Sequence, residues 1–473
     1  AQKKQPELGY GFAGIPSRLV KAFTCTHHRR CKCNGAQVMR AKGEKKMSQR
    51  SKKIVRVIGI IVVVLVAVLV VLIGVGYLTL VARPLKPPQS VSSLAELEAY
   101  LDDLTGHNPD SPPGLSLVVV KDGEIVYQKG FGLADGPRNI PATADTVYNQ
   151  WSMVKPMTAV TVLQLHEQGL LDIDDPVTDY LPFFDVIYPS ESSETITIRH
   201  LLNHSAGLRN NVPEIVSWIH FDGDPEWNQT ELIKEKLPDY AELAYEPGSE
   251  GIYTNVGYMV LAAIIEAASG QTYEQYMIDH IFKPLGMDQT NWTYTEAMIN
   301  NEATGASPSL DLQAQMLPFV LEKDKRDALI REKRDGVMWF NHVYTDQKGP
   351  TGPIGPPTDT ARFLMAYLNG GELDGQRILS AESVAILTNE GHILPGNTPE
   401  AADYKDYDET YHGLGWFYVV EGDDFFIAHS GGGPGFAADM RLYPDRDFGM
   451  VVLANGTYLA REEIADLVAS LDW

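Results

Sequence analysis

An uncharged apolar run near the start of the sequence limits what this chain can fold into. It covers the 26 residues Val57–Ala82 and reads VIGIIVVVLVAVLVVLIGVGYLTLVA. A helix of that length reaches roughly 39 Å, more than the hydrocarbon core of a bilayer, which is about 30 Å thick. Core helices rarely run this far without a polar residue, and the apolar part of a cleaved signal peptide is usually only about 7–15 residues. We therefore expect an uncleaved transmembrane helix at Val57–Ala82, in contact with the lipid bilayer.

Basic residues on the two sides of this run predict its orientation. Lys52, Lys53 and Arg56 lie directly before it, whereas Arg83 and Lys86 follow it. The excess of positive charge keeps the N-terminal side in the cytoplasm and sends the long C-terminal body across the membrane. We predict a single-pass protein of the cell membrane whose body is periplasmic or extracellular.

The leader before the apolar run, residues 1–56, holds 15 basic and 2 acidic residues. Met47 opens a short basic segment, MSQRSKKIVR, of the kind that precedes a membrane anchor. We expect translation to begin at Met47 or Met39, in which case residues 1–46 are not native. The alternative is a functional basic leader, for example an organelle targeting segment.

The body after residue 56 has the opposite charge, with 24 basic and 60 acidic residues. An acidic surface repels phosphate, so the body is not expected to bind nucleic acid. The body also has no cysteine, which excludes disulfides, thiolate metal sites and cysteine nucleophiles there. All three cysteines lie in the leader, at irregular spacing (Cys25, Cys31 and Cys33).

Patterning of the body predicts a Pro-rich linker at 83–92 and one folded domain at 93–473. Apolar runs flank Asp122-Gly123, a strong hairpin signal, and a capping-box pattern opens a short helix at Ser93. We expect helices in the middle of the chain, at 153–168, 198–202, 257–268, 273–281 and 358–368. We expect strands again near the C-terminus, at 425–429, 436–443 and 448–454, and a closing helix at 461–471. Strands at both ends with helices between them predict an α+β fold, in which an antiparallel sheet joins the termini and an inserted helical subdomain lies between.

The first segment that could carry chemistry is Ser152-Met153-Val154-Lys155-Pro156. Proline is tolerated only in about the first turn of a helix, so the helix that follows must begin close to Ser152. Its dipole then places positive potential at the Ser152 hydroxyl, and Lys155 lies on the same face. A lysine that loses its charge under apolar neighbours can act as the base for a serine nucleophile. Alone, S-x-x-K is a weak signal. Its simpler interpretation is an N-cap serine beside a lysine whose stem is buried and whose amine lies in solvent.

Two further segments are suggestive but weak when taken singly. If the chain is extended at Tyr253-Thr254-Asn255, the phenol and the amide project to the same side. His429-Ser430-Gly431-Gly432-Gly433 ends a predicted strand, and its glycines let a substrate approach closely. The simpler interpretations are a buried tyrosine with a turn asparagine, and a Gly-rich hairpin loop.

Taken together and in this order, S-x-x-K, Y-x-N and H-x-G resemble the motifs of the serine β-lactamase and penicillin-binding superfamily. The resemblance is greatest to its class C branch, which includes β-lactamases, D-Ala-D-Ala carboxypeptidases, D-aminopeptidases and esterases. It covers the chain from about Leu94 to the C-terminus. Further segments similar to that family are Ile196–Leu208, Tyr253–Gly270, Lys283–Thr290, Thr358–Leu364, Tyr411–Trp416 and His429–Phe436.

This resemblance implies a role for each motif residue. Ser152 would attack the substrate carbonyl and become acylated, while Lys155 and Tyr253 would exchange the proton. Asn255 would position the substrate amide and Lys155. The N–H groups of Ser152 and Gly432 would hold the oxyanion. Gly432 directly follows Gly431, the glycine of the H-x-G motif. We expect no metal and no cofactor.

His429 departs from the β-lactamase pattern, which usually has a lysine at this position. A histidine with an unperturbed pKa of about 6.5 is mostly neutral at pH 7 and gives a substrate carboxylate no permanent cation. An ester, amide or D-amino-acid peptide is therefore favoured as substrate, with a true β-lactamase or D-Ala-D-Ala carboxypeptidase as the alternative. We expect the segment Asn301–Gly355 to overhang the site and to shape acyl-group selection.

Other functional classes fit the sequence less well. Ala428–Gly432 mimics a nucleophile elbow, but no histidine follows His429 to complete its triad. His200 and His204 are spaced as zinc ligands would be on a helix, but the glutamate of that motif is missing, since residue 201 is leucine. A non-catalytic binding protein on the same fold remains as a second alternative, because fold alone does not establish activity.

Overall fold

A computed structural model of the chain describes residues 85–473, apart from 107, 210–217, 391–393, 396–403, 405–406 and 423; at 312–313, 390 and 394–395 it describes the backbone alone. All of these residues belong to one compact unit. The leader, the expected transmembrane helix at Val57–Ala82 and the start of the Pro-rich linker lie outside them. Within the described part of the chain, no helix has the length and apolar character needed to cross a membrane.

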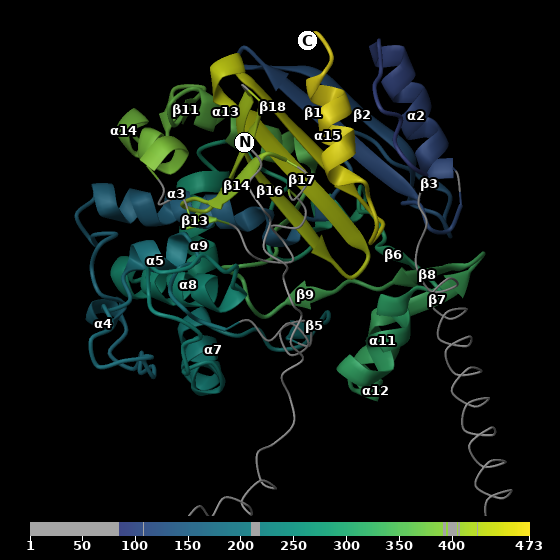
Figure 1. Ribbon diagram of the computed structural model, residues 1–473. Helices are drawn as coiled ribbons and strands as arrows, with labels where there is room; N and C mark the ends of the chain where they lie inside the picture. The colour runs from purple at the N-terminus through teal and green to yellow at the C-terminus, as the bar shows by residue number, and fades with distance from the viewer. Residues whose placement is uncertain are drawn as a thin grey trace, which may run out of the picture. The chain divides into compact units, whose positions relative to one another are not determined.

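A large antiparallel sheet forms the centre of the fold, and its strands come from both ends of the described chain (Figure 1). Nine described strands lie in the order β13-β14-β15-β16-β17-β18-β1-β2-β3. Their bounds are β13 Leu394–Pro395, β14 Glu409–His412, β15 Phe417–Glu421, β16 Asp424–Gly433, β17 Phe436–Tyr443, β18 Phe448–Ala454, β1 Gly114–Lys121, β2 Glu124–Asp135 and β3 Ile140–Pro141. The expected α+β fold with a sheet that joins the termini is thus confirmed.

The pairing of β1 with β18 joins the two ends, in a register that runs from Leu115–Ala454 to Lys121–Phe448. Side chains on β1 alternate between two cores, because successive residues of a strand face opposite sides. Leu117 and Val119 pack in one core, and Val118 in the other. Burial on both faces explains why this strand reads as a continuous apolar run rather than an alternating one.

Helices cover both faces of the sheet. α2 (Leu94–Gly106) and α15 (Arg461–Ala469) contribute to the core on one face, and Figure 1 shows them on the same side of the sheet. α13 (Pro357–Leu368) packs on β1 and β18 from the other face. The expected hairpin is present between β1 and β2, where Asp122 and Gly123 both have positive φ, as such a tight turn requires.

A mainly helical region lies between β3 and β13, and two long helices occupy its centre. α3 (Val154–Glu167) and α8 (Asn255–Ser269) pack against each other, and both are buried over most of their length. Because neither helix turns a broad face to water, apolar residues are spread around both helices instead of lying along one side. The other described helices here are α4 Val177–Tyr180, α5 Ile198–Leu202, α7 Gln229–Lys236, α9 Tyr273–Met277, α10 Glu296–Ile299 and α14 Ala381–Ala385. Short strand pairs join β4 (Tyr148–Asn149) to β10 (Ile354–Gly355), β5 (Ile219–His220) to β9 (Tyr344–Thr345), and β11 (Glu372–Leu373) to β12 (Gln376–Arg377).

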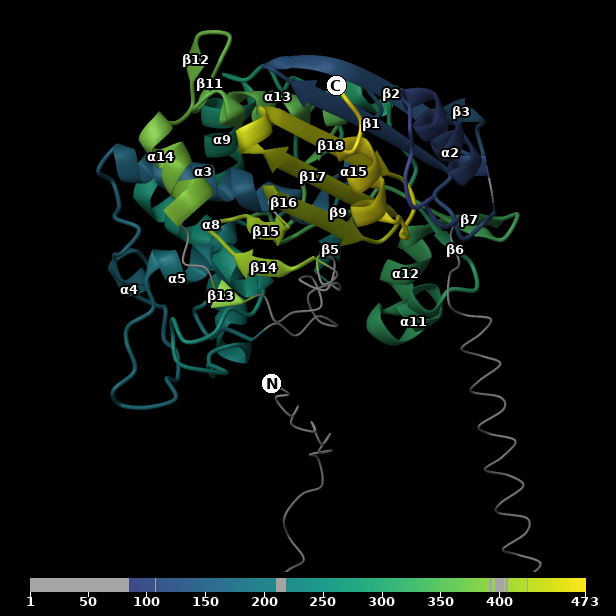
Figure 2. The same cartoon turned by 45° about the horizontal axis from the view of Figure 1, so that its top comes forward.

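The segment from Asn301 to Gly355 contains more regular structure than a helix and loop. It holds α11 (Leu312–Val320) and α12 (Lys323–Leu329), followed by β7 (Ile330–Arg334) and β8 (Val337–Phe340). β8 pairs with both β7 and β6 (Ala306–Pro308) in a small separate sheet. Figure 2 shows α11 and α12 lying to one side of the large sheet.

Candidate active site

Ser152 lies in a single 3₁₀ turn, Trp151–Met153, that leads directly into α3. The helix therefore begins next to the serine, as the position of Pro156 requires. Trp151 has a φ of 49°, a strained value for a bulky residue, and its N–H donates to Asn149 Oδ1 at 3.1 Å. Strain of this kind is found at functional sites, where the surrounding structure holds it in place. The turn presents Ser152 as the half-buried residue between two buried neighbours.

Lys155 has no solvent exposure, and its amine forms hydrogen bonds with groups from separate segments of the chain. Nζ donates to Ser152 Oγ at 3.1 Å, to Asn255 Oδ1 at 2.9 Å and to the Pro350 carbonyl at 2.8 Å. The same nitrogen lies 4.5 Å from the centroid of the Tyr253 ring. The fold thus brings the hydroxyl, the amine and the aromatic ring of the predicted site together from two distant segments.

Tyr253 and Asn255 reach the site in a way that the extended-chain argument did not foresee. The chain is extended only as far as Thr254, the N-cap of α8, and Asn255 is already the first residue of that helix. The Asn255 side chain nevertheless meets Lys155 Nζ. The buried ring of Tyr253 stacks on Phe417, with centroids 6.1 Å apart and planes 6° apart. A helix start, not strand alternation, therefore places the amide beside the lysine.

The H-x-G segment belongs to strand β16 and is not a loop, because the strand continues to Gly433. Gly431 lies directly against the serine turn. A Cβ at this position would be 2.2 Å from the Gln150 carbonyl oxygen and 3.3 Å from the backbone N of Ser152. At Gly432 the nearest atom to such a Cβ, on Arg461, is 3.5 Å away. Only glycine fits at position 431, and the oxyanion role of the Ser152 and Gly432 N–H groups stays a prediction.

His429 is buried next to this turn, with its ring centroid 5.4 Å from that of Phe417. Its Nδ1 lies 2.7 Å from the Ser430 carbonyl oxygen, so Nδ1 carries a proton. Burial is the main cause that lowers the pKa of His429 well below its usual value, and the charge of Lys155 is the second cause. The side chain is therefore neutral at pH 7 and supplies no cation for a substrate carboxylate.

Two more buried histidines surround Tyr253. The ring of His204 lies 4.5 Å from the Tyr253 ring, and its Nδ1 accepts a hydrogen bond from the Thr254 N–H at 3.2 Å. His412 lies 5.1 Å from His204, ring to ring. Burial lowers the pKa of His412 to about 4, and burial together with His412 and Lys155 lowers the pKa of His204 well below its usual value. Both rings are neutral at pH 7 and line the site without adding charge.

Sequence reasoning missed part of this environment. His412 lies within Tyr411–Trp416, a segment that carried the family resemblance, but nothing in that segment marked the histidine itself. Pro350 lies in a Gly- and Pro-rich loop, and its backbone carbonyl has no sequence signal. His200 accepts a hydrogen bond from the Thr197 N–H as part of the cap of α5.

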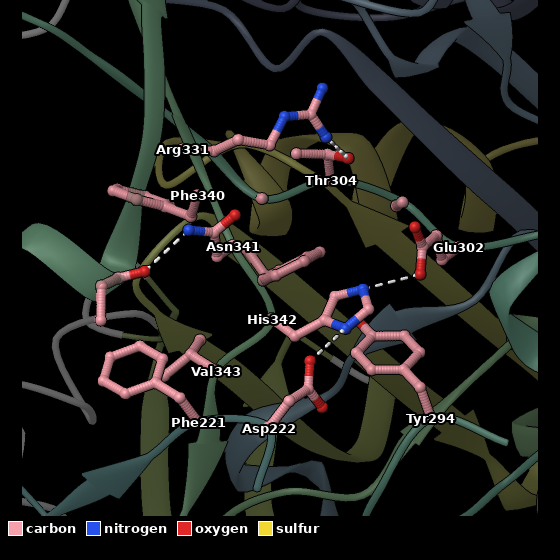
Figure 3. Close-up of a pocket in the computed structure, with 14 residues that line it drawn as sticks. Phe221, Asp222, Tyr294, Glu302, Thr304, Arg331, Phe340, Asn341, His342 and Val343 are labelled. Carbon is pink, nitrogen blue, oxygen red and sulfur yellow. Dashed lines mark hydrogen bonds and ion pairs between the residues drawn. The ribbon is translucent and has the colours of Figure 1, made fainter.

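A pocket of about 390 Å³ lies beside the small sheet, and much of its wall comes from the segment 301–355 (Figure 3). His342 lies between two carboxylates, with Nδ1 3.1 Å from Asp222 and Nε2 2.7 Å from Glu302. Burial alone would lower the pKa of His342, but the two carboxylates outweigh it and raise the pKa. Glu302 also accepts a hydrogen bond from Arg138 at 2.9 Å. The positive charges of His342 and Arg138 and the negative charges of Asp222 and Glu302 balance each other within the protein. None of the predicted site residues lines this pocket.

An antiparallel sheet with helices on both faces, and a serine and a lysine one turn apart at the start of a central buried helix, define a β-lactamase/transpeptidase-like protein. The family model described as Beta-lactamase matches residues 101–472. The chain therefore belongs to the β-lactamase family, whose members are serine hydrolases of the β-lactamase and penicillin-binding type.

Two curated relatives and one solved structure show how far the similarity extends. Penicillin-binding protein 4* of Bacillus subtilis is 29% identical over 72% of this chain and 67% of its own length. Protein flp of Staphylococcus aureus is 27% identical over 76% of this chain, but the match spans only 62% of that protein. The D-amino acid amidase of Ochrobactrum anthropi superposes with a TM-score of 0.60 over 79% of this chain and 97% of its own, at 22% identity, which supports the fold alone.

Proposed function

We propose that this protein is a serine hydrolase that acts through an acyl-enzyme on an ester, an amide or a D-amino-acid peptide. One observation carries the proposal: Lys155 Nζ lies 3.1 Å from Ser152 Oγ, while Asn255 and Pro350 hold the same nitrogen from other directions. A base within hydrogen-bond reach of a serine hydroxyl is the requirement for an activated nucleophile.

In the proposed reaction, Ser152 Oγ forms a bond to the substrate carbonyl carbon, and its proton moves to the Lys155–Tyr253 pair. The N–H groups of Ser152 and Gly432 stabilise the negative carbonyl oxygen. The tetrahedral intermediate expels the alcohol or amine, which takes up the proton and leaves an ester on Ser152. A water molecule then gives a proton to the same pair, attacks that ester and releases the acid, and the proton returns to Ser152.

The neutral state of His429 favours substrates without an obligatory carboxylate. Arg461 supports a second candidate, a carboxypeptidase acting on peptides with a free C-terminal carboxylate. Its guanidinium donates to the Gly431 carbonyl oxygen at 2.9 Å and places a positive charge next to the glycine strand. A cation at this point would attract the carboxylate that His429 cannot hold.

Location in the membrane is a separate part of the proposal and rests on the sequence. We propose that Val57–Ala82 anchors the protein in the cell membrane, with the leader in the cytoplasm and the hydrolase domain outside. The uncharged run and the basic residues before it support this arrangement. Membrane fractionation, followed by protease treatment of intact cells, should release the domain and leave the leader protected.

Labelling with a fluorophosphonate or a fluorescent penicillin, followed by intact-mass measurement, tests the chemistry. We expect one adduct on the wild-type protein and none on Ser152→Ala. An adduct that survives Ser152→Ala would identify another nucleophile, and no adduct with any probe would favour the non-catalytic binding protein. A panel of p-nitrophenyl esters, nitrocefin and D-Ala peptides would then separate esterase, β-lactamase and carboxypeptidase activity.

A further inference from the structure

We propose that Lys348 is a positioning residue for the catalytic step. Lys348 holds the loop 345–351 so that the Pro350 carbonyl orients the amine of Lys155. This inference rests on the proposed serine hydrolase function and adds a residue to it. Lys348 does not touch the reacting atoms. Lys348 lies two residues before Pro350 in the sequence, and its buried amine forms an ion cluster with Glu226 and Glu274.

Lys348 is a buried cation whose two carboxylate partners are partly exposed. The Lys348 side chain is 3% exposed, and its amine contacts the carboxylates of Glu226 and Glu274. Burial alone would lower the pKa of Lys348, but the two carboxylates outweigh it, so the pKa is raised and the amine is charged. Buried lysines are rare unless paired, and removal of Lys348 would leave two neighbouring carboxylates without a compensating cation. This cluster therefore fixes the Lys348 backbone relative to α9 and to the segment before α7.

The backbone around Lys348 is fixed by further hydrogen bonds. The Lys348 N–H donates to Gln229 Oε1 at 2.9 Å, and Gln229 Nε2 donates to the Asp346 carbonyl at 2.9 Å. Thr158 Oγ1, on α3, donates to the Gly349 carbonyl at 3.0 Å. The chain is thus held on both sides of Lys348. The carbonyl that follows Gly349 in the chain is that of Pro350.

The position of the Pro350 oxygen decides where the lone pair of Lys155 points. A neutral amine has two N–H bonds and one lone pair around its nitrogen. When Pro350 O, at 2.8 Å, and Asn255 Oδ1, at 2.9 Å, accept the two hydrogens, the lone pair is left toward Ser152 Oγ at 3.1 Å. A shift of the Pro350 carbonyl would let the amine rotate, and a misplacement of about 1 Å can lower a catalysed rate by about 100-fold.

Two substitutions separate positioning from a long-range effect of charge. Lys348→Met removes a positive charge, whereas Glu226→Gln removes a negative one, so an electrostatic effect on Lys155 would change the rate in opposite directions. A positioning role predicts that both substitutions lower it. Glu226 is nearly half exposed, so Glu226→Gln keeps the test decisive if Lys348→Met does not fold. Lys323→Met is the matched control, because it breaks an exposed ion pair with Asp327 on α12.

The experiment measures the rate at which a fluorophosphonate phosphonylates Ser152 in the full-length protein, with loss of fluoride, over a range of probe concentrations. We expect Lys348→Met to lower the maximal inactivation rate, kinact, by about 10- to 100-fold and Glu226→Gln by about 3- to 10-fold, with the half-saturating probe concentration, KI, within about twofold of wild type. Lys323→Met should match the wild type in both. Each rate is taken per folded molecule, from samples whose unfolding transition has been measured.

Three outcomes would overturn the inference: an unchanged kinact in Glu226→Gln and in any folded Lys348→Met, opposite changes in the two variants, or a loss that falls on KI alone. Failure of the proposed function looks different, because the wild-type protein itself would then carry no adduct on Ser152. A labelled wild type with unaffected variants removes only the role of Lys348.

Discussion

The imidazole of His204 lies 4.5 Å from the ring of Tyr253 and accepts a hydrogen bond from the N–H of the next residue, Thr254. His204 has a φ of 61°, in the left-handed region that few non-glycine residues adopt. One side chain thus supports the ring of the predicted proton-transfer residue and satisfies the backbone that enters α8. Backbone strain of this kind persists only where the surrounding contacts hold it in place.

This relationship predicts a graded response at position 204. His204→Ala should lower the free energy of unfolding by about 2–4 kcal/mol, because it leaves a cavity beside Tyr253 and an unpaired Thr254 N–H. His204→Asn should cost less, since asparagine tolerates positive φ and offers an acceptor. Urea unfolding of both variants measures the difference. Equal losses in the two would show that neither the backbone conformation nor the hydrogen bond at His204 matters.

Acid sensitivity should follow from the three buried histidines, His204, His412 and His429. The pKa of each is lowered in the folded state, so each group contributes stability that is complete above the unfolded pKa of about 6.5 and is lost as pH falls through the folded pKa. For His412 that window runs from pH 6.5 to about 4. Each histidine that takes up a proton on unfolding makes stability fall by about 1.4 kcal/mol per pH unit within its own window.

His412→Phe provides the test, because the Nε2 of His412 is buried without a hydrogen-bond partner among the described residues and its neighbours are aromatic. Phenylalanine takes up no proton, so the slope of unfolding free energy against pH between 6.5 and 4 should fall by about 1.4 kcal/mol per pH unit. Urea titrations at several pH values give this slope. An unchanged slope would mean that His412 already titrates normally in the folded protein.

Substitution of the two neighbouring glycines of β16 should have unequal effects. At Gly431 an added Cβ meets the Gln150 carbonyl oxygen at 2.2 Å, so Gly431→Ala must displace the serine turn and should cost about 1–3 kcal/mol. At Gly432 the nearest atom is 3.5 Å away, so Gly432→Ala should stay within about 0.5 kcal/mol of wild type. Thermal unfolding compares the pair directly, and similar losses in both would contradict this account of the turn.

A charge at position 429 should change substrate preference. His429→Lys would put a cation where the neutral histidine lies, and an ion pair with a substrate carboxylate should raise kcat/KM for nitrocefin relative to a neutral p-nitrophenyl ester by about tenfold. His429→Gln, which stays neutral, is the matched control and should leave that ratio unchanged. If lysine and glutamine gave the same ratio, position 429 would not contact the carboxylate.

Local patterns made parts of this protein predictable. The lysine three residues after Ser152 had to share a face with it, and Pro156 required the helix to begin nearby. Asp122-Gly123 required a tight turn between β1 and β2. The prediction of an extended chain at Asn255 was wrong because Thr254 caps a helix that begins at Asn255. The alternation of side chains expected for a strand does not reveal where a helix begins.

The sequence by itself determined the β-lactamase family, the spacing of Ser152 and Lys155 within one helical turn, and the apolar strands that needed burial on both faces. Only the tertiary structure decided which groups surround Lys155. The Pro350 carbonyl and the His412 ring carry no mark in the sequence, since a backbone oxygen is chemically the same at every position and a buried histidine looks like an exposed one. The Pro350 carbonyl reaches Lys155, and the His412 ring reaches Tyr253, because the pairing of β1 with β18 and the packing of α3 on α8 close the chain around the site.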